Sequence, residues 1–395
     1  MRARYIDIHV IQSVPAANLN RGEYDEPKTL LLGNTTRGAL SSQSIKRAGR
    51  MEMEAELGEP AVRTRMIPPR VIAALKDAGW PDELAVFAGA QIALCAVPKG
   101  LDTDREAGHR TLAMIYTAET GLLDDLTALC VRHRTRLEDG LAATQSNSTG
   151  PAPKTKTAKK AATDTSRCLP TKDVSEILTR RTACISLFGR MLAGHDASHV
   201  TGAAQIAWAF TTHTSDMQPD YFTAVEDWPT AGDRGSAHID TAFLMAGVFY
   251  RYSTVNLAQA ADNFGGDTKQ ALQHVALFME TFIMTLPQAK KNSTAPHTLP
   301  DTVHYVVRDR RPVSYAAAFD QPVRASQGGG YLVPTRQELS AQAALTDRLI
   351  GTRHRIGHGH TTAHPTLLDH LGPHHDSFDA LIAAAIHDAA LPDTT

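Results

Sequence analysis

Residues 5–12 read Tyr5-Ile6-Asp7-Ile8-His9-Val10-Ile11-Gln12, and this stretch sets the expected fold. Ile6, Ile8 and Val10 point to one side of the chain, whereas Asp7, His9 and Ile11 point to the other. A period of two residues is typical of a strand with one face in the core. The sequence therefore predicts a half-buried β-strand at the start of the domain.

Further strands and helices are expected in the C-terminal half. Gly247–Asn256 is rich in aromatic and β-branched residues and predicts a central strand, and Val303–Val307 predicts a shorter one. Apolar residues at helical spacing predict three helices, at 270–286, 338–350 and 378–390. Because strands are separated by helices from the N-terminus onward, the expected class is α+β, of the ferredoxin or RNA-recognition type.

The segment between residues 59 and 181 has a different pattern. Residues 83–95 and 111–133 carry apolar side chains at helical spacing, and 173–192 predicts a further helix. Residues 144–166, in contrast, consist mainly of Ser, Thr, Ala, Pro and Lys and contain no large apolar side chain. Such a composition cannot offset the entropy of ordering, so we expect a disordered loop there.

Composition limits the classes of function. The chain has 395 residues, 42% of them hydrophobic, and a formal net charge of −2, so a nucleic-acid site must be a local basic surface rather than a global field. Its four cysteines form no CxxC motif. Neither a signal peptide nor an apolar run of the ~20 residues that a membrane helix requires is recognisable. We therefore expect a cytoplasmic protein.

The helix expected to begin near Ser41 or Ser42 carries the clearest candidate site. Gln43, Lys46, Arg47 and Arg50 are spaced so that they share one helix face, and no acidic residue lies between them. Ser41, Ser42 and Gln43 stand at the helix start, where backbone N–H groups and the helix dipole favour a phosphate. Asn20 and Arg21 can approach from the preceding loop. The pattern predicts a site for a nucleic-acid backbone, although from charge alone a solvated basic face explains it equally well.

Two other features have more than one interpretation. Phe188-Gly189-Arg190-Met191 and Asp220-Tyr221-Phe222 place large apolar groups beside turn-forming residues; they can stack on bases or pack in a core. The C-terminal region is rich in histidine but has no HExxH motif, so a metal site there is the minority interpretation. Its histidines are His354, His358, His360, His364, His370, His374 and His375.

The sequence resembles the CasC family, the repeated backbone subunit of the type I-E CRISPR Cascade complex. The resemblance rests on segments that follow one another in the family's order. They are Tyr5–Val10, Leu19-Asn20-Arg21, Ser41–Ala48 with Arg50, Leu187–Met191, Thr211-Thr212-His213, Tyr221–Asp227, Gly247–Tyr252 and Gln288-Ala289-Lys290-Lys291.

The resemblance implies a modified RNA-recognition fold with two insertions. The palm comprises residues 1–58, 182–213 and 241–395; a helical fingers insertion spans 59–181; and a β-hairpin thumb spans 214–240. Copies of the chain are expected to stack head to tail along a CRISPR guide RNA, beside other Cascade subunits, and to present the RNA to a target DNA strand.

The resemblance also assigns residues. It implies that guide phosphates are bound by Asn20, Arg21, Ser41, Gln43, Ser44, Lys46, Arg47 and Arg50, and that Met191 and Phe222 flank a displaced base. No catalytic residue, metal or cofactor is expected. The alternative is a metal-dependent RNA-cleaving subunit of the type III kind, which would use an acidic residue such as Asp216 or Asp220.

Overall fold

The computed structural model describes residues 4–147, 167–192, 198–225, 227–228, 236–364 and 368–391. The chain divides into two compact units. The first comprises Met1–Met53 with Ala203–Thr395, and the second comprises Glu54–Gly202. Within the described ranges, no helix is both long and apolar enough to cross a membrane.

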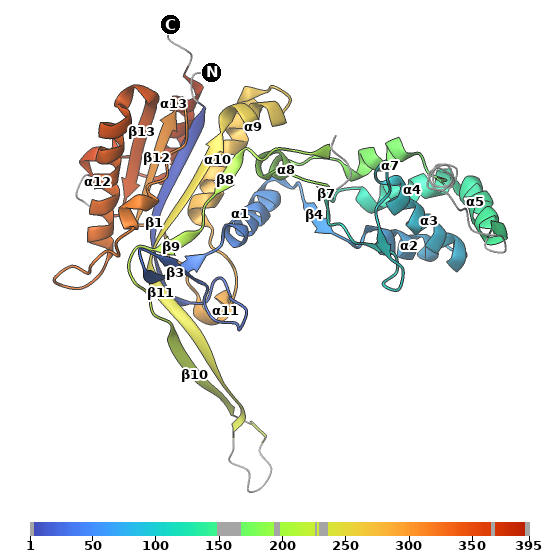
Figure 1. Cartoon of the computed structure of the whole chain (residues 1–395), viewed down its shortest axis with the longest axis horizontal. Helices are drawn as coiled ribbons and strands as arrows, with labels where there is room; N and C mark the ends of the chain where they lie inside the picture. Colours follow the sequence, from blue (N-terminus) through green and yellow to red (C-terminus); the bar gives the residue numbers. More distant parts are fainter. Residues whose placement is uncertain are drawn as a thin grey trace. The chain divides into compact units, whose positions relative to one another are not determined.

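The first unit is built on a large antiparallel sheet (Figure 1). Its strand order is β13-β12-β1-β11-β9-β3-β2, and β8 and β10 pair with β11. The strands are β1 (Tyr5–Ala17), β2 (Thr29–Leu32), β3 (Thr35–Leu40), β8 (Ala204–Ile206), β9 (Ala209–Thr211), β10 (Gln218–Val225), β11 (Ser236–Asn256), β12 (Thr302–Arg308) and β13 (Arg355–Thr362). A mixed α/β class with a central antiparallel sheet is thus confirmed.

Strand β1 lies between β11 and β12 and is buried on both faces, so the prediction of a half-buried strand was wrong. The polar side chains of β1 can be buried because residues from distant segments form hydrogen bonds with them. The Asp7 carboxylate accepts hydrogen bonds from Arg308 Nε (3.0 Å) and Val313 N (3.0 Å). A third comes from the Tyr252 hydroxyl at 2.9 Å.

Helices cover both faces of this sheet. On the face of Ile6, Ile8 and Val10 lie α10 (Thr268–Met284) and α13 (Phe378–Ala390), and Tyr305 of β12 donates a hydrogen bond to Asp388 of α13. On the opposite face, α12 (Leu332–Ile350) contributes Leu339 and Ala343 to a core with Ile11. These are the three helices expected from the sequence. The unit also contains α9 (Leu257–Asn263), α11 (Lys291–Thr294), and the 3₁₀ turns η2 (Ala316–Phe319), η3 (Thr352–His354) and η4 (Asp369–Leu371).

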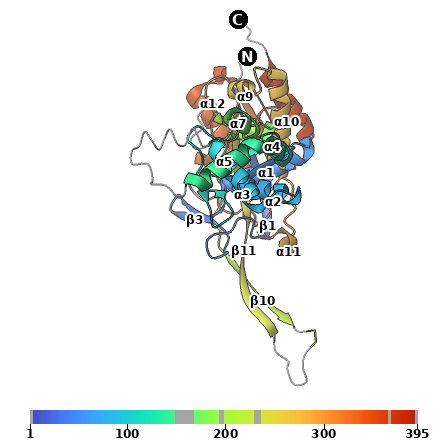
Figure 2. The same cartoon turned by 90° about the vertical axis from the view of Figure 1, so that its right-hand side faces the viewer.

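The longest strand, β11, belongs to two structures at once. Its first part pairs with β10, its one strand partner there among the described residues, and forms a hairpin that projects from the sheet (Figures 1 and 2). Its second part, from Gly247 to Asn256, pairs with β1 on one side and with β8 and β9 on the other. The central strand predicted over 247–256 is confirmed, and it begins eleven residues earlier than predicted.

The second unit is mostly helical, and most residues of its apolar core lie on its own helices, with Ile115 contributed by a strand. Its helices are α2 (Ile67–Asp77), α3 (Asp82–Cys95), α4 (Leu122–Arg132), α5 (Arg134–Asn147), α7 (Thr171–Leu178) and α8 (Ala183–Phe188). Two short antiparallel pairs complete it: β4 (Ala61–Thr64) with β7 (Ile115–Ala118), and β5 (Thr103–Asp104) with β6 (Arg110–Thr111).

Three predictions for the second unit need correction. The helix expected over 111–133 begins only at Leu122, because Ile115–Ala118 pairs with β4 as a strand. The helix expected over 173–192 is two helices, since α7 ends at Leu178 and α8 begins after the cap residue Thr182. Of the loop expected over 144–166, residues 144–147 are the last turn of α5, and the rest lies outside the described residues.

Candidate nucleic-acid interface

Helix α1 (Ser42–Leu57) begins where the sequence predicted. Ser41 is the residue before the helix, and its hydroxyl accepts a hydrogen bond from Ser44 N at 3.4 Å, as an N-cap does. The backbone N–H of Ser41 donates in turn to Asn20 Oδ1 at 2.7 Å. The helix start is therefore fixed to the loop that carries Asn20 and Arg21.

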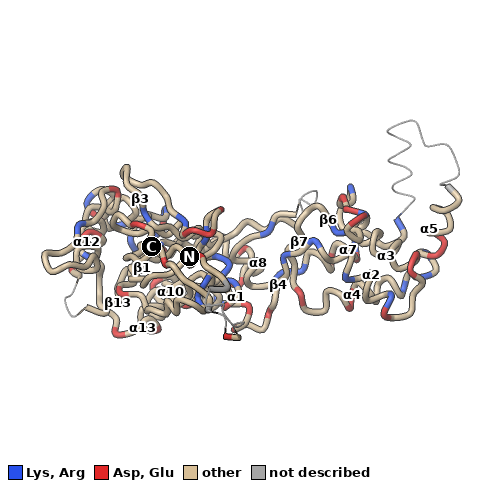
Figure 3. Tube along the Cα trace, turned by 90° about the horizontal axis from the view of Figure 1, so that it is seen from below, with Lys and Arg blue, Asp and Glu red and all other residues tan. Residues whose placement is uncertain are grey.

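The face predicted to bind phosphate is turned away from the core. Ile45, Ala48, Gly49 and Met53 are the buried residues of α1 in the described structure. Gln43 and Arg47 are exposed, whereas Lys46 and Arg50 are partly buried. Figure 3 shows basic segments in blue around α1. The local sequence pattern thus gives a basic face, as the spacing indicated.

A pocket of about 460 Å³ lies beside this helix. It brings together four of the predicted residues, Asn20, Arg21, Ser44 and Arg47. Arg21 also forms an exposed ion pair with Asp25 at 2.9 Å, so its guanidinium already has one anionic neighbour. Two arginines with an amide and a hydroxyl at a helix start can donate several hydrogen bonds to one phosphate group.

The other predicted residues of α1 do not line this pocket. Ser41 is buried and acts as the N-cap, while Gln43, Lys46 and Arg50 continue the basic face along the helix. Beyond the pocket, further donors follow at three- and four-residue spacing along the helix. Such a row suits the successive phosphates of a nucleic-acid backbone better than a single phosphate.

Sequence reasoning missed two residues that line the pocket. Gln288 and Ala289 complete its lining, and they come from the loop between α10 and α11. The available signal was the segment Gln288-Ala289-Lys290-Lys291, which follows Pro287 and supported the family resemblance. Nothing in the local pattern indicates that it lies beside residues more than 240 positions earlier in the chain.

Phe222 and Met191 are not among the residues that line the pocket. Phe222 lies on β10, opposite Asp240 of β11, and is 40% exposed. Met191 belongs to the second unit, where its side chain is 79% exposed. Next to it, the buried Arg190 donates to the carbonyls of Thr179 and Arg180, each at 2.9 Å. Burial lowers the pKa of Arg190 to about 10, so the group stays charged at neutral pH and fixes this segment.

One histidine of the C-terminal region, His360, is buried in the sheet. His360 lies on β13 directly across from His304 of β12, which lies across from His9 of β1. All three are buried. Over the described ranges, no three His, Cys, Asp or Glu side chains are grouped so that they could bind a metal ion.

Comparison with known proteins gives a consistent result. A family model described as CT1975-like protein matches residues 6–384. A solved chain of a "CRISPR RNA-guided surveillance complex, pre-nicking" is 36% identical, with a TM-score of 0.81, and the match covers 98% of this chain and 100% of that one. A chain of a "CRISPR RNA-guided surveillance complex" is 32% identical, with a TM-score of 0.74 and coverage of 97% and 99%.

No curated protein matches the sequence. The family model nevertheless spans nearly the whole chain, and the similarity to both solved chains extends from end to end. The order of motifs from Tyr5 to Lys291 predicted the same relationship. The chain therefore belongs to the CT1975-like family of CRISPR-associated proteins, the CasC-type backbone subunits that its sequence resembles.

Proposed function

We propose that this protein is a non-catalytic backbone subunit that binds CRISPR guide RNA in a type I-E Cascade complex. The observation that carries the proposal is the pocket at the start of α1, where Asn20, Arg21, Ser44 and Arg47 meet beside a basic helix face. Phosphate groups are the feature that every guide RNA shares, so a subunit that contacts only the backbone can coat any guide sequence.

The similarity to chains of CRISPR RNA-guided surveillance complexes supports the choice of ligand. In this proposal the palm, of the RNA-recognition type, comprises residues 1–58, 182–213 and 241–395, the helical fingers span 59–181, and the thumb hairpin spans 214–240. Copies of the chain stack head to tail in the cytoplasm together with other Cascade subunits. They hold the guide so that a target DNA strand pairs with it, and Phe222 and Met191 flank a displaced base.

Co-expression with a guide transcript tests the central claim. The wild type and the double variant Lys46→Glu/Arg50→Glu are each purified by size-exclusion chromatography, with absorbance followed at 260 and 280 nm. We expect a large RNA-containing species for the wild type and an RNA-free species for the variant. An RNA-free monomer in both cases would contradict binding by this chain alone.

The absence of catalysis has its own test. Purified wild type is incubated with guide RNA and with complementary RNA in the presence of Mg²⁺, and the RNA is followed on a denaturing gel. We expect both RNAs to remain intact. Cleavage that disappears in Asp216→Ala or Asp220→Ala would favour the metal-dependent alternative.

A further inference from the structure

Arg251 is a buried cation at the end of a helix. It lies on β11 with 1% of its surface exposed, and burial lowers its pKa to about 10, so it is charged at neutral pH. Its guanidinium donates to Thr285 O (2.9 Å), Ile283 O (3.3 Å) and Phe282 O. The last carbonyls of a helix have no partner inside it, and a cation there is favourable. Arg251 therefore fixes the C-terminus of α10.

Gln12 connects the Arg251 guanidinium to the backbone of Thr298. Arg251 donates to Gln12 Oε1 at 2.6 Å, and Gln12 Nε2 donates to Thr298 O at 2.7 Å. Gln12 pairs with Phe249 across β1 and β11, which places Gln12 and Arg251 diagonally on the same face of the sheet. The hydroxyl of Thr298 also donates to Ser13 O at 2.6 Å.

The segment from Thr285 to Thr298 is thus attached to the sheet at both ends through one buried pair. This segment, called loop 285–298 below, carries Gln288 and Ala289, which line the α1 pocket together with Arg47. Helix α1 also lies against the start of the loop, since a Cβ atom on Gly49 would come within 3.8 Å of Thr285 Oγ1. A displacement of either end would move the wall of the pocket.

We propose that Gln12 and Arg251 are positioning residues for RNA binding: without contacting the RNA, they hold loop 285–298 in the place that completes the phosphate pocket. The inference rests on the proposed function. It adds that the geometry of the pocket depends on a side-chain contact inside the sheet, and that loss of this contact weakens RNA binding while the α1 residues stay intact.

Gln12→Glu is the most local test. A glutamate retains an acceptor for Arg251 but loses the N–H that reaches Thr298 O, and it presents an anionic oxygen to that carbonyl. Arg251→Lys is a second variant, which keeps the charge but not the fork that serves several carbonyls. Arg308→Lys is the matched control: Arg308 is 2% exposed and also hydrogen-bonds a neighbouring strand, but it serves Asp7 and Tyr315.

Two quantities are measured on the full-length chain well below the melting temperature: the Kd for a single-stranded RNA and the hydrogen-exchange rate of amides in loop 285–298. We expect Gln12→Glu to raise the Kd about tenfold and to speed exchange in the loop. Arg251→Lys should act in the same direction. Arg308→Lys should lower the melting temperature and change neither quantity.

The outcomes separate this inference from the proposed function. If the wild type binds RNA and Gln12→Glu exchanges faster in the loop but binds with an unchanged Kd, the positioning role is wrong. The same holds if Arg308→Lys weakens RNA binding as much as Gln12→Glu does, because the effect would then be one of general stability. If the wild type itself binds no RNA, the proposed function fails, and the role of the pair in RNA binding fails with it.

Discussion

The side-chain oxygen of Asn20 accepts a hydrogen bond from the backbone N–H of Ser41 at 2.7 Å, and so joins the loop before β2 to the first residue of the helix start. This contact has two separable roles. It satisfies an N–H group of a buried residue, and it places the Asn20 amide beside the pocket that Arg47 also lines.

Substitution of Asn20 can separate these roles. Asn20→Ala leaves the Ser41 N–H without its acceptor and should lower the free energy of unfolding by about 1–2 kcal/mol. Asn20→Asp retains the acceptor but puts a negative charge at the pocket, so its stability should be close to that of the wild type while its RNA affinity falls. Denaturant titration and RNA binding measured on the same samples check both. Equal affinity of Asn20→Asp and wild type would contradict a phosphate site.

Single neutralisations of Lys46, Arg47 and Arg50 test contact with the RNA backbone. For single-stranded RNA, each lost phosphate contact should reduce the slope of log Kobs against log salt concentration by ~0.7. The loss should be the same for unrelated RNA sequences. Lys269→Gln is the control, because Lys269 is an exposed basic residue on α10. A slope that changes equally in the control, or depends strongly on RNA sequence, would speak against backbone recognition by α1.

Phe222 should stack on a base, and the hairpin provides its own control. Tyr221 is the neighbouring residue on β10, points to the opposite face and is 64% exposed. Phe222→Ala should weaken RNA binding by about 1–3 kcal/mol, the usual contribution of one stacked base, whereas Tyr221→Ala should leave base stacking unchanged. Base stacking is measured by the fluorescence of 2-aminopurine placed along the guide. Identical spectra for the Phe222→Ala variant and the wild type would exclude the stacking role.

The row of histidines across β1, β12 and β13 predicts sensitivity to acid. Burial lowers the pKa of His304 to about 3, and it also lowers the pKa values of His9 and His360 below the usual 6.5. The Nε2 atoms of all three have no hydrogen-bond partner among the described residues. Between pH 6.5 and those lower values, the unfolded chain binds protons that the folded chain does not, so the free energy of unfolding falls as the pH falls.

Each suppressed protonation contributes up to about 1.4 kcal/mol per pH unit below 6.5. For His304, this contribution to the free energy of unfolding is fully present above pH 6.5 and is lost progressively toward pH 3. Chemical unfolding between pH 7.5 and 4.5 measures it. His304→Gln should reduce the slope of the free energy of unfolding against pH by nearly one proton. An unchanged slope in His304→Gln would show that His304 is protonated in the folded protein.

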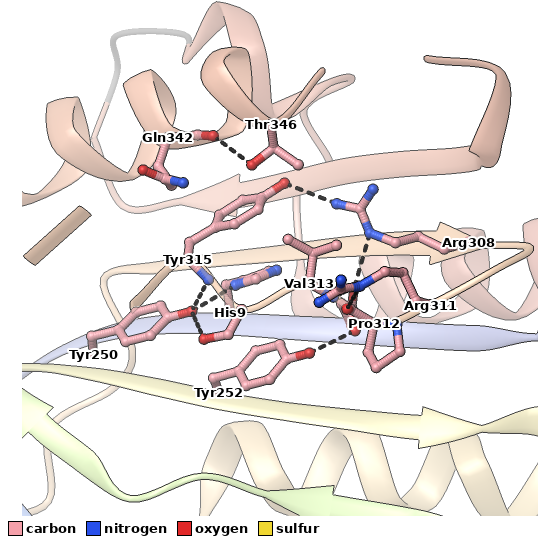
Figure 4. A network of polar contacts seen from close by, with 12 residues as sticks. His9, Tyr250, Tyr252, Arg308, Arg311, Pro312, Val313, Tyr315, Gln342 and Thr346 are labelled. Atoms are coloured by element: carbon pink, nitrogen blue, oxygen red, sulfur yellow. Dashed lines mark hydrogen bonds and ion pairs between the residues drawn. The ribbon is translucent and has the colours of Figure 1, made fainter. Parts of the chain in front are cut away.

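The Asp7–Arg308 ion pair is buried, so we expect the stability of the fold to fall strongly when one member of the pair is removed. It is buried next to Tyr252 and Tyr315 (Figure 4). Arg308→Met leaves a buried carboxylate unpaired and should cost about 3–5 kcal/mol. Asp7→Asn/Arg308→Met removes both charges. The Asn oxygen can still accept from Val313 N, and its NH2 group can donate to the Tyr252 hydroxyl, so the double variant should be more stable than the single variant. A double variant that is less stable would contradict this account.

The sequence predicted correctly those helices and strands that are marked by residue periodicity or by a helix cap within the element itself. The 3.6-residue period and the Ser41 cap located α1, and the β-branched and aromatic run located the second half of β11. The prediction for β1 was wrong because alternation of polar and apolar residues normally means a solvated face. Here the partners that bury Asp7 and His9 lie more than 240 residues away.

The candidate site also has one part that the sequence predicted and one part that it did not. The basic face of α1 follows from residue spacing, and the pocket wall from Gln288 and Ala289 does not, since it depends on where α10 ends against the sheet. The helix expected over 111–133 was wrong for a related reason. Ile115–Ala118 becomes a strand because β4, more than 50 residues earlier, pairs with it.

Strand β11 joins two regions of different stability within one continuous backbone. Between Ser236 and Leu244 its pairing partner among the described residues is β10, whereas from Phe249 onward strands pair with it on both sides. Opening of the hairpin therefore needs no disturbance of the sheet, but unfolding of the sheet necessarily releases the hairpin. Amide protection should rise stepwise along this one strand near Gly247, so the hairpin can yield to a ligand while its base stays fixed.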